Sequence, residues 1–156
     1  MENIPSAVHS ITDGRLTLKK PHVDFLKNPP HVIVTYGPGN RVLLHNPTEY
    51  DRLIERLFGG TTGMLDADQY FVAQRLENVA EIAAIDDQSR MRLSQIFLDR
   101  MEIKEKSAKI YAVTAKRDGW LELHGASFNK SFDDAKDPWL RALSRLVTAS
   151  RAKQTG

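Results

Sequence analysis

Apolar and polar residues alternate over short stretches of the chain, a pattern typical of strands with one buried face. Residues 15–18 alternate in this way, with Leu16 and Leu18 on the same side. Two further strands are predicted at His31–Tyr36 and at residues 41–45. The sequence GPGN between them is typical of a turn, so we expect these two strands to form a hairpin.

Elsewhere apolar residues recur every three to four positions, which predicts helices. The first covers Pro47–Phe58, with Thr48 as its expected N-cap. A second helix is expected to start at Asp66 or Asp68 and to run to about Val79. Its inward-facing residues are predicted to be Tyr70, Phe71, Ala73 and Leu76.

A last helix is predicted to begin at Pro138 and to end near Ala149, where a frayed tail follows. The tail is basic and the middle of the chain is acidic. Residues 49–81 carry seven acidic and three basic side chains, a net charge of −4, and residues 136–156 carry five basic and one acidic, a net charge of +4. The basic tail is therefore either a solvated helix face, which we favour, or a contact for a phosphate backbone.

The sequence also contains an internal repeat. Residues 11–26 align with residues 86–101, and residues 32–50 align with residues 111–129. The second copy is longer between these two blocks, with four extra residues near residues 104–109. Each copy is predicted to contain a strand, a short helix, a strand, a turn and a strand, and KRDG is the turn of the second copy.

The composition excludes several classes of protein. The chain has 156 residues and no cysteine, which rules out disulfides, thiolate nucleophiles and cysteine-ligated metals. No apolar run approaches the about 20 residues that a membrane-spanning helix needs. The five histidines lack the spacing of metal ligands. Asp86 and Asp87 are interpreted as adjacent strand residues, which point to opposite faces, so they cannot share a proton. We therefore expect no enzyme activity, cofactor, metal, small-molecule substrate or membrane contact.

Two tandem copies of a short motif, in which an acidic residue precedes an arginine on a strand, resemble the MraZ family of bacterial transcriptional regulators. The motif of that family has Asp four residues before Arg, often with Gly immediately before the Arg. Asp86 and Arg90 keep this spacing, with Ser89 in the glycine position. The resemblance covers roughly residues 10–132 and depends on the order and repetition of the motifs.

The first copy departs from this pattern. Gly14 and Arg15 match the motif, but the residue four positions before Arg15 is Ile11, and Asp13 is the acidic residue nearby. The departure affects either the function of this copy or only the geometry of its turn.

The resemblance implies the fold, because MraZ proteins belong to the AbrB-like swapped-hairpin barrels. We expect an α+β fold with a mainly β core, a pseudo-twofold double AbrB-like swapped-hairpin barrel with flanking helices. The expected divisions are a first AbrB-like half at residues 8–58, a helical connector at 59–80, a second half at 81–132, and a C-terminal helix and tail at 133–156. Apolar helix stripes that one small barrel cannot cover are expected to form subunit contacts.

Basic residues near the two motifs are the predicted DNA contacts: Arg15, Lys19, Lys20, Arg90 and Arg92. Arginine on a rigid strand can donate two hydrogen bonds to guanine or phosphate, and a β-ribbon fits the major groove. Asp13 and Asp86 are expected to orient the arginines. The alternative is that Asp86 and Arg90 form an ordinary surface ion pair of little energetic weight.

The net charge of +2, from 22 basic and 20 acidic residues, is low for a DNA-binding domain. We therefore expect several subunits to act together. As the resemblance implies, the predicted function is a sequence-specific double-stranded DNA-binding transcriptional regulator that reads repeated boxes as a ring-shaped homo-oligomer, cytoplasmic and nucleoid-associated. The alternative is an AbrB-like protein-interaction or antitoxin-type module that has lost specific DNA binding. Basic strand faces in both copies favour the first function.

Overall fold

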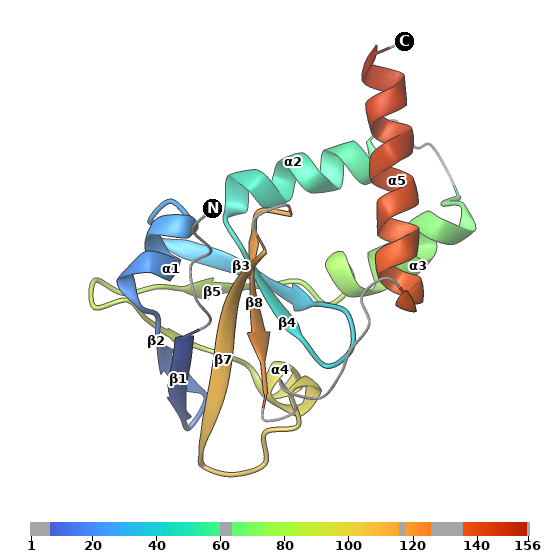
Figure 1. The fold of residues 1–156 in the computed structure, drawn as a ribbon. Helices are drawn as coiled ribbons and strands as arrows, with labels where there is room; N and C mark the ends of the chain where they lie inside the picture. The colour runs from blue at the N-terminus through green and yellow to red at the C-terminus, as the bar shows by residue number, and fades with distance from the viewer. Residues whose placement is uncertain (1–6, 60–63, 116–117, 126–135, 156) are drawn as a thin grey trace.

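The computed structural model describes residues 7–59, 64–115, 118–125 and 136–155. Within these residues, eight antiparallel strands form a nearly closed, barrel-like sheet with five helices around it, so the fold is α+β (Figure 1). The strand order is β5-β3-β4-β8-β7-β1-β2-β6. The strands are β1 (Ala7–Thr12), β2 (Arg15–Thr17), β3 (His31–Tyr36), β4 (Val42–His45), β5 (Glu81–Ala84), β6 (Arg90–Arg92), β7 (Ser107–Ala115) and β8 (Trp120–His124). The helices are α1 (Lys20–Phe25), α2 (Pro47–Phe58), α3 (Ala67–Leu76), α4 (Gln95–Arg100) and α5 (Pro138–Thr155).

Strands of the two sequence repeats are interleaved in the sheet. β1, from the first copy, pairs along its whole length with β7 of the second copy. β5, from the second copy, pairs with β3 of the first. β2 pairs with β6, and β4 pairs with β8, again across the two copies. Each copy therefore completes the sheet of the other.

The register of the strands follows the alignment of the two copies. In the β2–β6 pair, Leu16 lies opposite Met91, its equivalent in the first aligned block. In the β4–β8 pair, Leu43 lies opposite Glu122, its equivalent in the second aligned block. Equivalent positions of the two copies thus face each other at two places in the sheet, in agreement with the sequence repeat.

Two apolar cores hold the elements together. The inside of the barrel is filled by side chains from both copies, which include Ile11, Leu16, Leu18, Val34, Leu44, Met91, Leu93, Phe97, Ile110 and Leu123. The second core contains Leu43, Leu57, Val72, Leu76, Trp120, Trp139, Ala142 and Leu143. In Figure 1, α2, α3 and α5 gather on one side of the sheet, and the C-terminal end of α5 extends beyond it. Both tryptophans are buried in this second core, so neither is exposed as a platform on which a base could stack.

Helix α2 has the predicted bounds but a different N-cap. The side-chain oxygen of Asn46 accepts hydrogen bonds from the backbone N–H groups of Thr48, at 2.8 Å, and of Glu49, at 3.2 Å. The prediction of Thr48 as the cap was therefore wrong. Pro47 is the reason, because proline suits the first helical position and places the cap one residue before it.

Helix α3 starts where one of the two predictions placed it and ends earlier than expected. Asp66 is its N-cap and forms a capping box with Gln69. The helix ends at Leu76 rather than near Val79. Tyr70 was predicted to face inward but is 59% exposed. The buried side chains of the helix are Val72, Ala73 and Leu76.

Helix α5 is longer than predicted. It begins at Pro138 but continues through Ala149 to Thr155, so the expected frayed tail is helical. No glycine or proline follows Pro138 before Gly156, and nothing in the sequence therefore stops the helix.

The inserted residues of the second copy form a loop and lengthen a strand. Residues 104–106 form the loop, and residues 107–109 begin β7, which has nine residues where β3 has six. Predictions for residues 60–63, 116–117 and 126–135 lie outside the described residues. Among the helices in the described part of the chain, none is long and apolar enough to cross a membrane.

Candidate nucleic-acid interface

The two arginine-bearing strands lie side by side. In the β2–β6 pair, Arg15 is opposite Arg92, and Thr17 is opposite Arg90. The middle residue of each strand is buried and the four outer residues are exposed. Because side chains alternate along a strand, these four outer side chains share the solvent-facing side of the ribbon.

Three of the predicted DNA contacts are therefore on one surface, which we call the arginine strip (Arg15, Arg90 and Arg92). The sequence placed these residues on two copies of a motif, and the sheet brings the two copies together. The arginine strip lines a pocket of about 410 Å³ together with Ala84, Ile85, Asp86 and Met91. Three arginines and one aspartate line this pocket, so its lining has two net positive charges and attracts anions, although the net charge of the whole chain is only +2.

Asp86 organises the second-copy part of the strip. One of its carboxylate oxygens accepts hydrogen bonds from the backbone N–H groups of Gln88 and Arg90, both at 2.9 Å. The other accepts from Arg90 Nε at 2.8 Å. The backbone bond from Arg90 is the largest cause of a pKa of Asp86 below its usual value, and the side-chain bond from Arg90 acts in the same direction. Asp86 thus holds Nε of the Arg90 guanidinium group, and both terminal nitrogens of Arg90 are free of contacts with other described residues.

Asp13 contacts Lys106 and Arg92 and does not contact Arg15, the arginine of its own motif. Its backbone N–H donates to Lys106 O at 2.9 Å, and its carboxylate lies 4.0 Å from Lys106 Nζ. Its carbonyl oxygen accepts from a terminal nitrogen of Arg92 at 3.2 Å. Among the described residues, no hydrogen bond or ion pair joins Asp13 to Arg15. In this structure Asp13 therefore positions Arg92 rather than Arg15.

The three arginines of the strip thus differ in how firmly they are held. Arg90 is held by a carboxylate and Arg92 by a carbonyl group. Arg15 forms no side-chain hydrogen bond or ion pair with any residue that the structure describes. The strip therefore combines two positioned guanidinium groups with one that is free to adapt to a ligand.

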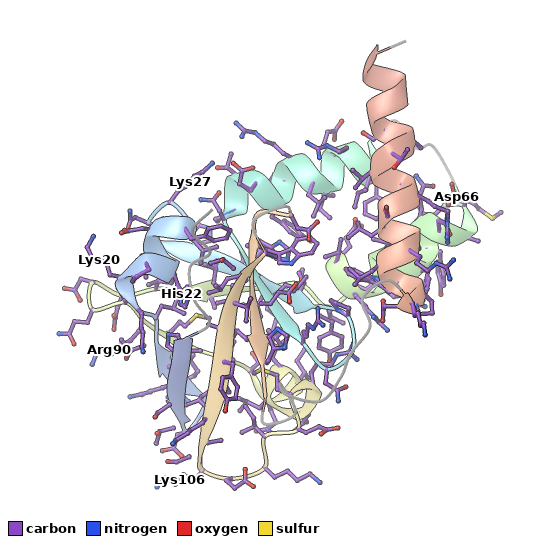
Figure 2. The ribbon with its side chains drawn as sticks, in the orientation of Figure 1. Lys20, His22, Lys27, Asp66, Arg90 and Lys106 are labelled. Atoms are coloured by element: carbon purple, nitrogen blue, oxygen red, sulfur yellow. The ribbon has the colours of Figure 1, made fainter. Side chains whose placement is uncertain are left out.

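The predicted lysine contacts lie at the start of α1. Lys20 Nζ donates to Asp24 at 3.1 Å, and the Lys20 side chain is 85% exposed. Lys19 is also exposed, and its backbone N–H donates to His9 Nε2 at 3.3 Å. In Figure 2, Lys20 and Arg90 project on the same side of the molecule. Lys20 can therefore add to the positive field of that side.

The prediction that Asp86 and Asp87 lie on a strand was wrong. Asp86 and Asp87 are not strand residues, because β6 begins only at Arg90 and the preceding residues form a turn. The Asp86 carboxylate is occupied by the backbone bonds of this turn. No group of three or more metal-binding side chains occurs among the described residues.

His45 is the last residue of β4 and has a structural role. The ring is buried, and its Nε2 lies 2.8 Å from Thr35 Oγ1. Its burial lowers the pKa of His45 to about 3, so the ring is neutral at physiological pH.

The basic tail and the acidic middle of the chain contact each other. Two nitrogens of Arg145 in α5 donate to the two carboxylate oxygens of Asp68 in α3, each at 2.8 Å. These bonds lower the pKa of Asp68 and raise the pKa of Arg145. Sequence reasoning described the two charged regions separately, because a contact between residues so far apart in the chain leaves no local signal. The exposed ion pair of Arg145 is compatible with a solvated helix face in this part of α5.

Lys106 is a neighbour of the strip that the sequence analysis missed. With Lys104, it lines a pocket of about 710 Å³ that also includes Asp13 and Arg92. The only signal in the sequence was the insertion near residues 104–109 of the second copy. A scan of the sequence against protein-family models and a search of curated proteins each find no match.

Proposed function

We propose that this protein binds double-stranded DNA in a sequence-specific manner and acts as a transcriptional regulator. The observation that carries the proposal is the arginine strip, in which the two copies supply Arg15, Arg90 and Arg92 to adjacent strands of one ribbon. A two-stranded ribbon is one of the elements that the major groove of DNA admits.

The chemistry of the strip suits this role. The free terminal nitrogens of Arg90 can donate two parallel hydrogen bonds to O6 and N7 of guanine, and Asp86 fixes the side chain before DNA arrives. Such preorganisation reduces the ordering entropy that binding costs. Arg15 and the nearby lysines supply adaptable contacts to phosphate oxygens.

The interleaved strands support a double AbrB-like swapped-hairpin barrel with an approximate twofold relation between its halves. With the motif of Asp86 and Arg90, this arrangement extends the resemblance to MraZ regulators. We propose by that resemblance a ring-shaped homo-oligomer that is cytoplasmic, nucleoid-associated and specific for repeated DNA boxes. Several strips acting together offset the low charge of a single chain.

Selection from a random duplex library, followed by anisotropy titration of the selected duplex at several salt concentrations, tests the proposal. We expect enrichment of a repeated box, and we expect the logarithm of the binding constant to fall linearly with the logarithm of the salt concentration. Arg90→Ala should reduce discrimination between the box and a scrambled duplex by roughly 5- to 150-fold, the value of one bidentate base contact. Arg15→Ala should have a smaller effect, because no described residue holds Arg15 in place.

Arg52→Ala is the matched control, because Arg52 is an exposed arginine on α2. It should bind the box as the wild type does. If no box is enriched, or if all three alanine variants bind alike, the strip does not read DNA. The protein-interaction module then replaces the DNA-binding function. The solution mass tests the ring separately, because a monomer excludes it.

A further inference from the structure

Two arginines that are not part of the arginine strip converge on one carbonyl group. Arg100, the last residue of α4, donates from a terminal nitrogen to the carbonyl oxygen of Gly37 at 3.0 Å. Arg75, in α3, donates to the same oxygen at 3.5 Å. The three residues belong to three separate parts of the chain, so the fold alone brings the two guanidinium groups together.

Aromatic rings form the walls behind these arginines. The guanidinium carbon of Arg100 lies 4.7 Å from the centre of the Tyr36 ring. That of Arg75 lies 5.6 Å from the Trp139 ring and 6.0 Å from the Phe71 ring. Cation–π contacts of this kind help to hold a guanidinium group in place.

Among the residues that the structure describes, no direct contact with an acidic group neutralises the positive charge of the pair. Within the described part of the chain, no carboxylate lies within 4.0 Å of either guanidinium group. Burial lowers the pKa of both arginines, and Arg75 lowers that of Arg100 further. Asp137 raises both pKa values from a greater distance, but its carboxylate caps α5 through Leu140 N at 2.8 Å.

The pair also has hydrogen-bond donors to spare. A guanidinium group has five N–H donors, and each of these two donates one bond within the described structure. Nε of Arg100 is buried and has no partner there. The nearby carboxylate of Glu102 accepts a bond from Asn40 at 3.0 Å. Two adjacent, half-buried guanidinium groups with free donors are what a tetrahedral oxyanion requires.

We propose that Arg75 and Arg100 form a binding site for a phosphate group, beside the loop that starts at Gly37. The phosphate belongs either to a free small anion or to the backbone of DNA, since both present the same oxygens. Its negative charge balances the two guanidinium groups, and its oxygens accept from the free donors. The site depends on no residue of the arginine strip, and its free-anion form does not depend on the proposed function.

Thermal unfolding of the full chain in sodium phosphate, compared with sodium chloride of equal ionic strength, tests the site without DNA. We expect a saturable rise in the melting temperature that only phosphate produces. Arg100→Lys, which keeps the charge but loses the fork, should weaken the apparent phosphate affinity roughly tenfold. The double variant Arg75→Gln and Arg100→Gln should abolish the rise, and Arg52→Gln should retain it.

A duplex titration separates the two sources of phosphate. If Arg100→Gln reduces the slope of log Kd against log salt by about 0.9, the bound group is a backbone phosphate. An unchanged slope, together with loss of the phosphate-dependent rise, identifies a free anion. Two results together overturn the proposal. The first is a melting temperature that phosphate raises equally in the wild type and the double variant, or raises in neither. The second is a slope of log Kd against log salt that Arg100→Gln leaves unchanged.

Discussion

The two turns that lead into the arginine strip reach the same surface by different chemistry. In the first half, Thr12 pairs with Arg15, and only Asp13 and Gly14 lie between them. These two residues have φ values of 51° and 77°. Positive φ at both central positions is what a two-residue type I′ hairpin requires, and Asp-Gly is a favoured sequence for it.

The second half has a three-residue loop instead. Asp86 N donates to Arg90 O at 3.0 Å, and Ser89 N donates to Asp86 O at 3.0 Å. Ser89 has a φ of 62°, a conformation in which glycine is more common. The Asp86 carboxylate stabilises this less favourable loop by accepting two of its backbone N–H groups.

The comparison explains the irregular motif of the first copy. Asp13 is not a displaced counterpart of Asp86, because it is the first residue of a tighter turn. A turn closed by Asp-Gly needs no carboxylate to hold it, so the first half can lack the acid that the second half requires. The departure from the motif is therefore a difference in turn geometry.

The two halves also differ in the side chain that each of their short helices, α1 and α4, buries. His22 in α1 and Phe97 in α4 are equivalent in the repeat, and each is 1% exposed. The Phe97 ring packs against the Tyr36 ring, with 5.6 Å between their centres. Neither ring nitrogen of His22 has a hydrogen-bond partner among the described residues, and the His9 ring lies 5.5 Å away.

This difference predicts the largest effect, a loss of stability in acid that comes from the first half. Burial, and then His9 and Lys19, lower the pKa of His22 from 6.5 to about 4. Between these values the unfolded chain binds a proton that the folded chain does not, so stability falls as the pH decreases. The slope is up to about 1.4 kcal/mol per pH unit for each such histidine. His22→Phe introduces the equivalent residue of the second half. The free energy of unfolding, measured with urea between pH 7 and 5, should then depend on pH less steeply, by the slope of one such histidine.

His45 should contribute a second slope in the same direction and keep it in this variant. His22→Leu repeats the test with a smaller side chain, in case phenylalanine does not fit. A pH dependence that is identical in wild type and both His22 variants contradicts the prediction.

Exchanging glycine and serine at the left-handed positions of the two turns should change the free energy of unfolding by a smaller amount. The two substitutions should have opposite signs. Gly14→Ser should destabilise the fold by about 1–3 kcal/mol, because a side chain there adopts a left-handed conformation and its Cβ lies 3.0 Å from Leu93 O. Ser89→Gly should stabilise it by about 0.5–1 kcal/mol, because relief of strain exceeds the entropic cost of glycine. Urea unfolding with an unchanged m-value measures both. Destabilisation by both substitutions means that the two turns do not differ as described.

Local patterns in the sequence predicted most of the elements. The apolar stripe of Pro47–Phe58, the alternation around Leu16 and the hairpin after Tyr36 each depend on neighbours within a few residues. The N-cap at Asn46 was missed because Thr48 has the same capping chemistry and only the position of the proline separates them.

The sites could be predicted only in part, because they depend on long-range register. The sequence identified Arg15 and Arg92 as candidates, but their placement opposite each other requires β2 to pair with β6 of the other copy. Arg75 and Arg100 gave no signal, because each lies on a different helix and their common partner is the backbone of Gly37.

The smallest effect concerns the two acids, and it tests whether they share a role. Asp86→Asn keeps the oxygen that accepts the backbone N–H groups of the turn but removes the charge that holds Arg90 Nε. Discrimination between the selected DNA box and a scrambled duplex should therefore fall roughly three- to tenfold, part of one bidentate contact. Asp13→Asn should change discrimination less than twofold, a small part of that contact, because the Asp13 carbonyl and not its carboxylate positions Arg92. Equal losses in the two variants would mean that Asp13 orients an arginine through its charge when DNA is bound, and that the halves differ in structure but not in function.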